Sequence, residues 1–235
     1  MPKTLELSLS ERRIPISTTI LYCSSGREDP AFEKRIIDSL LEVSGDLPIV
    51  SVTQFPSNLG RNICVGDVGA SGYNYFRQIL VGLKEIDTKF VIMAEADCLY
   101  PKGYFNYVPE RDDVCYRSTK VYVMPDRRHY FFHKREGSTL GQIVGRDFYR
   151  DTLEKLFEDA PMWNVEEKNF PKERHKQEDI FTHIERFDPP APLVTFKTHN
   201  GLRFYTHSDR TPILQLPYWG DGRKLRNWYF HGVRK

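Results

Sequence analysis

The chain has 235 residues and a mass of 27.6 kDa, which is the size of one ordinary domain. Its residues are 40% hydrophobic and 28% charged, a balance that supplies a core and excludes an intrinsically disordered chain. Lysine and arginine number 34 against 32 acidic residues. The net charge of +2 therefore gives no global attraction to nucleic acid or membrane, and such a partner would have to meet a local patch.

The cysteines and the apolar runs bear on the compartment. The four cysteines include no C-x-x-C pair, which excludes a zinc ribbon or a disulfide-stapled scaffold and predicts buried free thiols for three of them. They are Cys23, Cys64, Cys98 and Cys115. The first residues lack an apolar signal segment, and the longest apolar run, Phe90 to Ala94, is far too short to span a membrane. We therefore expect a cytoplasmic protein in a reducing environment, without a membrane span.

Strand and helix patterns alternate in the first half of the chain. β-Branched and aromatic runs predict strands, and apolar residues at helical spacing predict helices that start at Asp29-Pro30 and Ser71. The predicted strands are 18–23, 49–55 and 90–94, and the predicted helices are 29–45 and 71–86. Short links between alternating strands and helices are typical of a parallel, doubly wound sheet.

The second half has a different pattern. We predict a strand over 114–124, helices over 146–158 and 177–187, a polar loop over 160–176, and a β-hairpin over 193–207 that turns at Asn200-Gly201. The chain is thus predicted to be a single α/β domain with a mixed, mostly parallel, Rossmann-like sheet and flanking helices. The sequence leaves the oligomeric state open.

Polar residues follow the predicted strands of the first half, and ligands of open α/β sheets bind at the carboxyl ends of the strands. The apolar strand at 90–94 leads directly into Glu95 and Asp97. In extended geometry these two side chains point to the same side of the sheet. Paired carboxylates suit a hard divalent cation that also contacts phosphate oxygens. The alternative is an ordinary acidic turn that closes the strand.

The string VIMAEADCLYP resembles the acid-x-acid element at the strand end of GT-A fold glycosyltransferases, especially the family 2-like group. The helix GASGYNYFRQILVGL and the opening ILYCSSGRED are similar to elements of the same fold. The resemblance implies a GT-A fold that transfers a sugar from a nucleoside-diphosphate sugar, with UDP-sugar as the expected donor. It implies a donor-binding half at about residues 15–110 and an acceptor-binding half at about 111–235.

The resemblance also implies site residues. Expected donor-binding residues are Cys23, Ser24, Ser25, Arg27, Gln54, Asp67, Arg77, Glu95, Ala96 and Asp97. A metal ion, Mn²⁺ or Mg²⁺, would be held by Asp97 and Glu95 with either His199 or His207. The run Gln177-Glu178-Asp179 resembles the element that supplies the base of inverting GT-A enzymes, so we expect Asp179 to be the base, with Glu178 as its substitute. An acidic helix start stabilised by the helix dipole is the alternative.

Two basic and aromatic segments bear on the acceptor. Residues 127–135 and 222–235 interleave cations with aromatic side chains and contain no acid, which suits a phosphate backbone and an unstacked base. Solvated surface charge is the alternative. Expected acceptor-binding residues are Arg128, Tyr130, Gly137, Ser138, Arg226 and Trp228.

The single-domain build is similar to that of phage enzymes that glycosylate 5-hydroxymethylpyrimidines in DNA. This makes double-stranded DNA with hydroxymethylated bases, extruded from the stack, the expected acceptor. A transferase for cell-surface polysaccharide or lipid-linked sugar is the alternative acceptor class. A sugar-nucleotide nucleotidyltransferase and a non-catalytic nucleic-acid-binding module are the alternatives of other classes.

Overall fold

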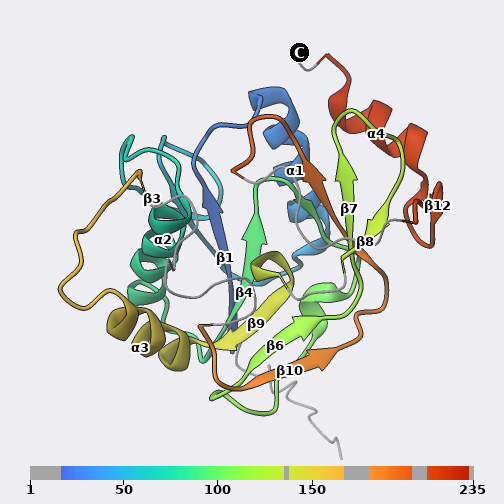
Figure 1. Cartoon of the computed structure of the whole chain (residues 1–235). Coiled ribbons are helices and arrows are strands. Elements are labelled where there is room, and N and C mark those ends of the chain that lie inside the picture. Colours follow the sequence, from blue (N-terminus) through green and yellow to red (C-terminus); the bar gives the residue numbers. More distant parts are fainter. Residues whose placement is uncertain (1–16, 135–137, 167–179, 203–210, 233–235) are drawn as a thin grey trace, which may run out of the picture.

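A mixed, seven-stranded sheet is the centre of the computed structural model, which describes residues 17–134, 138–166, 180–202 and 211–232 (Figure 1). The strands run in the order β10 (Ile184–Phe187), β6 (Cys115–Ser118), β9 (Gln142–Gly145), β4 (Phe90–Glu95), β1 (Thr18–Ser24), β2 (Ile49–Thr53) and β3 (Arg61–Cys64). Strand β9 is antiparallel to both of its neighbours, and the other pairs are parallel.

A second, smaller sheet packs beside the first. Its order is β5 (Cys98–Leu99), β11 (Leu193–Lys197), β7 (Val121–Pro125) and β8 (Phe132–His133). A short ribbon pairs β12 (Gln215–Leu216) with β13 (Gly220–Asp221). The helices are α1 (Pro30–Val43), α2 (Gly72–Lys84), α3 (Arg146–Leu156) and α4 (Gly222–Phe230), with 3₁₀ turns η1 (Tyr104–Asn106) and η2 (Thr139–Gly141).

The predicted helix starts are confirmed by their caps. The Asp29 carboxylate accepts from the backbone N–H groups of Ala31 and Phe32, and Pro30 occupies the first position of α1, where no N–H is needed. Ser71 Oγ accepts from Asn74 N at 3.0 Å at the start of α2. These local bonds fix where each helix begins and hence where the preceding loop meets the sheet edge.

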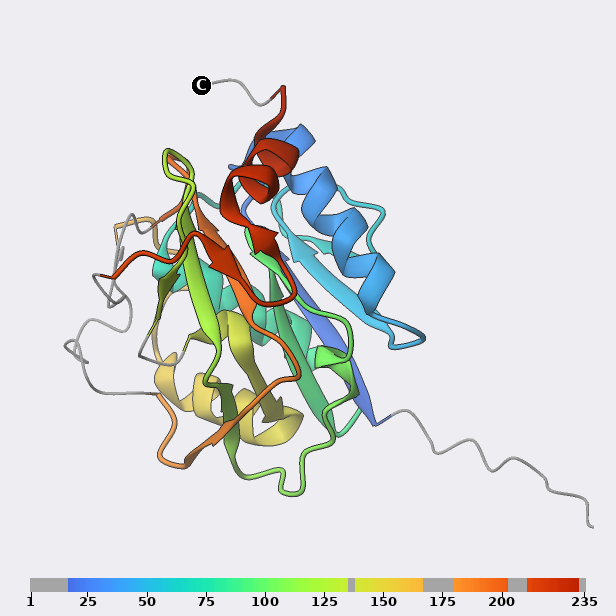
Figure 2. The same ribbon diagram turned by 90° about the vertical axis from the view of Figure 1, so that its right-hand side faces the viewer.

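Alternation along the buried strands divides the core into layers. Ile20 and Tyr22 of β1 pack towards the small sheet, whereas Leu21 and Cys23 pack towards α2 and α3. A third layer lies between the small sheet and helices α1 and α4, which lie side by side in Figure 2. Because one core cluster joins residues of both sheets, the described chain forms a single α/β domain.

Two predictions for the second half are wrong. Residues 184–187 of the predicted helix 177–187 form β10, which pairs in parallel with β6; residues 177–179 lie outside the described part. This pairing and the burial of Phe187, whose ring stacks on Tyr107 at 4.3 Å, outweigh the weak helix preference of a segment rich in aromatic and β-branched residues. The predicted strand 114–124 is two strands, β6 and β7, which belong to different sheets.

The predicted hairpin over 193–207 is also wrong where it can be checked. A strand has two edges, and those of β11 are filled by β7 and β5. Neither Asn200 nor Gly201 has a positive φ, and the residues from 203 to 207 lie outside the described part. Strand β3 was missed, because it lies at the sheet edge within a glycine-rich loop and buries little apolar surface.

The other predictions about strands, helices and cysteines agree with the structure. The first-half strands 18–23, 49–55 and 90–94 correspond to β1, β2 and β4, and the helix 146–158 corresponds to α3. Cys23, Cys98 and Cys115 are buried free thiols, and Cys64 is an exposed one. Residues 160–166 of the predicted loop have no regular structure. Among the helices described, none has the length and apolar character needed to cross a membrane.

Candidate functional site

Strands β1 and β4 are adjacent and parallel at the centre of the large sheet (Figure 1). Charged side chains gather at their carboxyl ends. Cys23 of β1 is in register with Glu95 of β4, so both strands end at the same level. Strand β11 of the small sheet runs next to the turn that follows β4, since Phe196 N donates to Asp97 O at 2.7 Å. Three segments far apart in the sequence therefore meet at this edge, where ligands of open α/β sheets bind.

Glu95 faces helix α2. Its Oε1 accepts from the Tyr75 hydroxyl and from Thr139 Oγ1, each at 2.7 Å. Burial raises the pKa of Glu95 above its ordinary value, and the nearby negative charge of Asp97 raises it further. Glu95 thus continues the alternation of β4, in which Met93 also packs on the α2 side.

Asp97 has a different partner. Its Oδ2 accepts from Lys197 Nζ at 3.2 Å, and its Oδ1 is buried without a hydrogen-bond partner among the described residues. The expectation that Glu95 and Asp97 share one side through extended geometry is therefore incorrect. The strand ends at Glu95, and the turn at residues 96 and 97 directs Asp97 towards β11 instead. The two carboxyl groups are still close enough to interact electrostatically.

Lys197 and Glu28 are site residues that the sequence analysis missed. Thr198 Oγ1 donates to Glu28 Oε1 at 2.7 Å, so Glu28 lies beside β11 in the turn that follows β1. Burial raises the pKa of Glu28 to about 7, with the charges of Asp97 and Glu33 adding to the effect while the Thr198 hydrogen bond and Lys197 oppose it. The acidic and polar turn 24–29 was a signal for Glu28, whereas Lys197 closes an unremarkable apolar strand.

The other expected donor residues surround this edge in several ways. Ser24 Oγ accepts from Gly26 N at 3.0 Å, and the Gln54 side chain is buried and donates to Gly69 O. Cys23 is buried beside Glu95, and burial raises the pKa of its thiol. Ser25 and Ala96 are half-buried, and Arg27 and Asp67 are exposed. Ser24, Glu95 and Ala96 are thus at the edge itself, while Asp67 belongs to the loop after β3.

Arg77 makes its contacts away from this cluster. Its guanidinium donates to the carbonyl oxygens of Ala160 and Pro161 and lies 3.9 Å from the ring centre of Phe157. These contacts attach the segment after α3 to helix α2. The described bonds of Arg77 are therefore those of a packing residue, and they do not test its expected donor contact.

The expected metal ligands are not assembled in the described part of the chain. His199 pairs with Asp126 through Nδ1 at 3.2 Å, and no three acidic, histidine or cysteine side chains described here come together as a metal site. His207 lies outside the described residues. Glu95 accepts two hydrogen bonds and Asp97 holds an ammonium group, so these residues as they stand do not fit a divalent cation. The expected grouping of His199 with Asp97 and Glu95 is not found.

The expected base and part of the acceptor site cannot be placed. Glu178, Asp179 and Gly137 lie outside the described residues. Ser138 precedes η2, the turn whose first residue, Thr139, bonds Glu95, so this segment does border the charged cluster.

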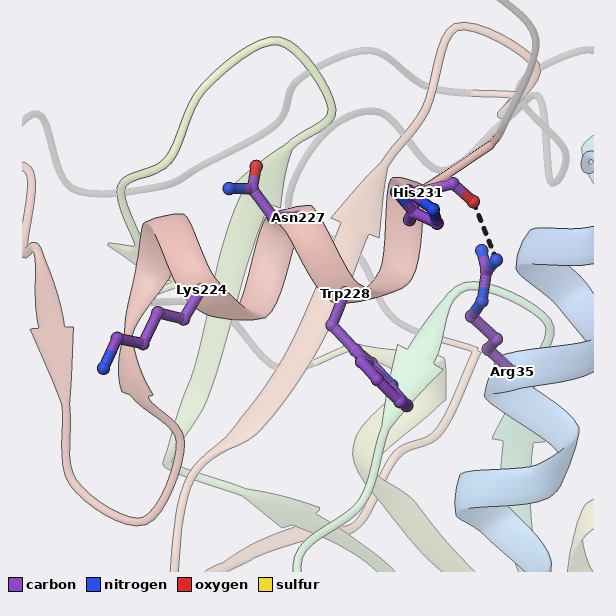
Figure 3. Close-up of a pocket in the computed structure, with 5 residues that line it drawn as sticks. All are labelled: Arg35, Lys224, Asn227, Trp228 and His231. Carbon is purple, nitrogen blue, oxygen red and sulfur yellow. Dashed lines mark hydrogen bonds between the residues drawn. The ribbon is translucent and has the colours of Figure 1, made fainter.

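The remaining acceptor candidates lie on α4 and in the turn after β7. Arg226 of α4 donates to Asp126 O, next to the turn that carries Arg128 and Tyr130. Trp228 is 70% exposed and borders a shallow groove with Arg35 and Lys224 (Figure 3). Phe196 packs on Tyr229 and Phe230 of α4, whereas its neighbour Lys197 reaches Asp97. Because neighbouring strand residues point to opposite faces, α4 and the charged cluster lie on opposite sides of β11.

No protein-family profile matches the sequence, and no curated protein sequence matches it.

Some solved structures are similar to this chain at low identity and low TM-score. One is a glycosyltransferase involved in the glycosylation of the major capsid of PBCV-1, with 12% identity and a TM-score of 0.43 over 76% of this chain and 92% of that chain. Another is HddC from Yersinia pseudotuberculosis, with 13% identity and a TM-score of 0.44 over 75% of this chain and 92% of that chain. The 1–349 fragment of S. aureus TarS matches at 10% identity and a TM-score of 0.45, over 77% of this chain and 60% of that chain. At these values the likeness says nothing about the chemistry of this chain.

Proposed function

We propose that this protein is a glycosyltransferase that moves a sugar from a nucleoside-diphosphate sugar, with UDP-sugar as the first donor to test, to an acceptor hydroxyl. The observation that carries the proposal is the cluster of Glu28, Glu95, Asp97 and Lys197 at the carboxyl ends of β1 and β4. Half-buried ionisable groups that lie close together at the ligand-binding edge of an α/β sheet are typical of a reaction site. The resemblance of VIMAEADCLYP to the GT-A acid-x-acid element gives the reaction class.

The reaction places negative charge on the leaving phosphate and removes a proton from the acceptor hydroxyl. As the bond between the anomeric carbon and the diphosphate breaks, negative charge grows on the leaving phosphate, and a positive group fixed nearby stabilises it. The acceptor hydroxyl must lose its proton as the new C–O bond forms, so a carboxylate has to take that proton. In this proposal Asp179 is the base, with Glu178 as its substitute, and the sugar is inverted. The metal expected from the resemblance has no step here, because the described ligands do not fit it.

The proposed acceptor is a hydroxymethylpyrimidine base in double-stranded DNA. It is supported by the basic and aromatic surface where α4 meets α1, at which Lys224 and Trp228 are exposed and Arg35 lines the same groove (Figure 3). Cations beside an aromatic side chain suit a phosphate backbone and an unstacked base. This surface and the charged cluster lie on opposite sides of β11. In the proposed function the surface of α4 binds DNA, and the sugar is transferred at the cluster.

One experiment tests donor, acceptor and reaction class together. DNA containing 5-hydroxymethylcytosine is incubated with the protein and a mixture of sugar nucleotides, once with Mn²⁺ and once with EDTA, and the nucleosides are then analysed by mass. A gain of one sugar on the modified base, with release of nucleoside diphosphate, is the expected result. Release of the diphosphate without a gain on DNA would contradict the acceptor alone. No release from any donor under either condition would contradict the transferase.

A further inference from the structure

Lys197 is an ammonium group built into the carboxylate cluster. Its side chain is 20% exposed, and Nζ lies 3.2 Å from Asp97 Oδ2, whose own side chain is 15% exposed. The group is thus neither a solvated surface lysine nor sealed off from ligands. It lies at the carboxyl ends of the central strands, where a ligand of this sheet would place its phosphates.

The backbone that carries this ammonium is held by strand pairing on both sides. Strand β11, which ends at Lys197, pairs with β7 over its whole length and with β5 at Val194 and Thr195. Phe196 N also donates to Asp97 O, so the backbones that carry Lys197 and Asp97 are bonded to each other one residue away from the ion pair. A charge held this way needs little rearrangement to meet a ligand, which is the property that makes electrostatic stabilisation effective.

The ammonium faces negative charge. Asp97 Oδ2 is its ion-pair partner, and the carboxyl group of Glu95 is close enough to interact with it electrostatically. A divalent cation bound at Asp97 would lie next to this ammonium, and like charges at contact distance repel strongly where water is scarce.

One atom of the pair is left for a ligand. Asp97 Oδ1 is buried and accepts no hydrogen bond from the described residues, although a buried carboxylate oxygen without a donor is costly. Oδ2 is engaged by Lys197, so a hydroxyl of a bound molecule is a suitable donor to Oδ1. The pair therefore offers a cation and an acceptor side by side, which suits a molecule that carries both a diphosphate and sugar hydroxyls.

We propose that Lys197 contacts the diphosphate of the bound nucleotide sugar and supplies the positive charge that a divalent metal would otherwise provide, with Asp97 as the residue that positions it. This inference rests on the proposed function and deepens it. It makes diphosphate binding independent of divalent metal. In the reaction, the bond from the anomeric carbon to the phosphate oxygen breaks, its electron pair stays on that oxygen, and the Lys197 ammonium offsets the resulting charge without giving up its proton.

Calorimetry in EDTA tests this directly. It measures the binding of inorganic pyrophosphate and of UDP to the full chain. Wild type is expected to bind both ligands. Lys197→Met should weaken binding at least about tenfold, because a charge-assisted bond to phosphate is lost, whereas Lys197→Arg should keep most of it. Lys34→Met is the matched control, since Lys34 is an exposed lysine on α1 paired with Asp38, and its binding should equal that of wild type.

A double variant separates a loss of binding from a loss of the folded structure. Lys197→Met leaves Asp97 buried without its partner, so a melting curve is recorded, and the double variant D97N/K197M removes both charges and should fold while failing to bind pyrophosphate. The inference would be overturned if wild type bound pyrophosphate only after Mn²⁺ is added, or did not bind it with or without metal. Unchanged binding by Lys197→Met or by a folded D97N/K197M would also overturn it. Metal-dependent sugar transfer by Lys197→Met would do so while leaving the proposed function intact. Metal-free pyrophosphate binding lost in D97N/K197M, with no turnover of any donor, would support the inference and contradict the transferase.

Discussion

Lys197 and Asp97 are one hundred residues apart in the chain, yet their side chains form an ion pair at the carboxyl end of β4. The pair exists because β11 of the small sheet runs past the turn that follows β4, with Phe196 N bonded to Asp97 O. A charge pair at this edge, together with Glu95 and Glu28, is the feature from which the proposed chemistry follows.

Removing one partner of this pair should destabilise the fold more than removing both. Asp97→Asn leaves the Lys197 ammonium without its partner in a mostly buried place, and about 2–4 kcal/mol of unfolding free energy should be lost. The double variant D97N/K197M should recover a large part of that loss. Urea unfolding of the single and double variants measures this, and additive losses would mean that the two side chains do not interact.

Glu28 should make stability depend on pH. Burial raises its pKa in the folded protein to about 7, above the value of about 4.3 in an unfolded chain, so the folded state holds the proton more tightly. Its stabilising contribution is fully present below about pH 4 and is lost as the pH rises through 7, a change of roughly 3 kcal/mol by pH 7.

Glu28→Gln removes this titration. Unfolding free energies of wild type and Glu28→Gln, measured from pH 4 to pH 8, should differ most at the alkaline end, where the variant is the more stable. Parallel pH profiles for the two proteins would show that Glu28 titrates normally in the folded state. Glu33→Gln, on α1 beside the same edge, should reduce the pH effect without abolishing it, because the charge of Glu33 only adds to the raised pKa of Glu28.

Arg77 should support the fold without binding the donor diphosphate. Arg77→Met removes hydrogen bonds to Tyr73 Oη and to the carbonyl oxygens of Ala160 and Pro161, together with the contact on Phe157. A loss of about 2–4 kcal/mol in unfolding free energy is expected, with pyrophosphate affinity unchanged within about twofold. Calorimetry at a temperature where the variant is folded checks this. A tenfold weaker affinity for pyrophosphate would indicate that Arg77 binds the donor.

The surface of α4 should bind DNA without contributing to stability or to diphosphate release. Trp228→Ala combined with Lys224→Ala alters exposed side chains, so stability should change by less than about 0.5 kcal/mol for each. DNA binding, followed by fluorescence anisotropy across a salt series, should weaken and show a shallower salt dependence, while nucleoside diphosphate release without DNA stays the same. Unaltered DNA affinity in this variant would contradict the role of α4.

Much of the first half of the fold could be predicted from the sequence because its signals are local. Asp29 and Ser71 cap the helices that follow them, and the apolar strands β1 and β4 are continuous runs that need no distant partner to be recognised. The acid-x-acid element follows one of these strands, so Glu95 and Asp97 could be placed at the sheet edge in advance.

The second half depends on pairings between distant segments, which spacing does not reveal. Residues 184–187 have apolar residues compatible with a helix and become β10 only because β6 offers a free edge and Phe187 has a pocket beside Tyr107. Lys197 closes a short apolar strand, and nothing near it in the sequence points to Asp97. The same limit applies to Glu28, whose raised pKa comes from burial against β11 rather than from its neighbours in the chain.

The most direct test of the central claim is the release of nucleoside diphosphate from a panel of sugar nucleotides by wild type and by Asp97→Asn, each shown to be folded. Sugar transfer at the cluster of Asp97 and Lys197 predicts release by wild type from at least one donor, and release slower by about a hundredfold or more by the variant. No release by wild type from any donor, or equal rates for the two proteins, would contradict the account.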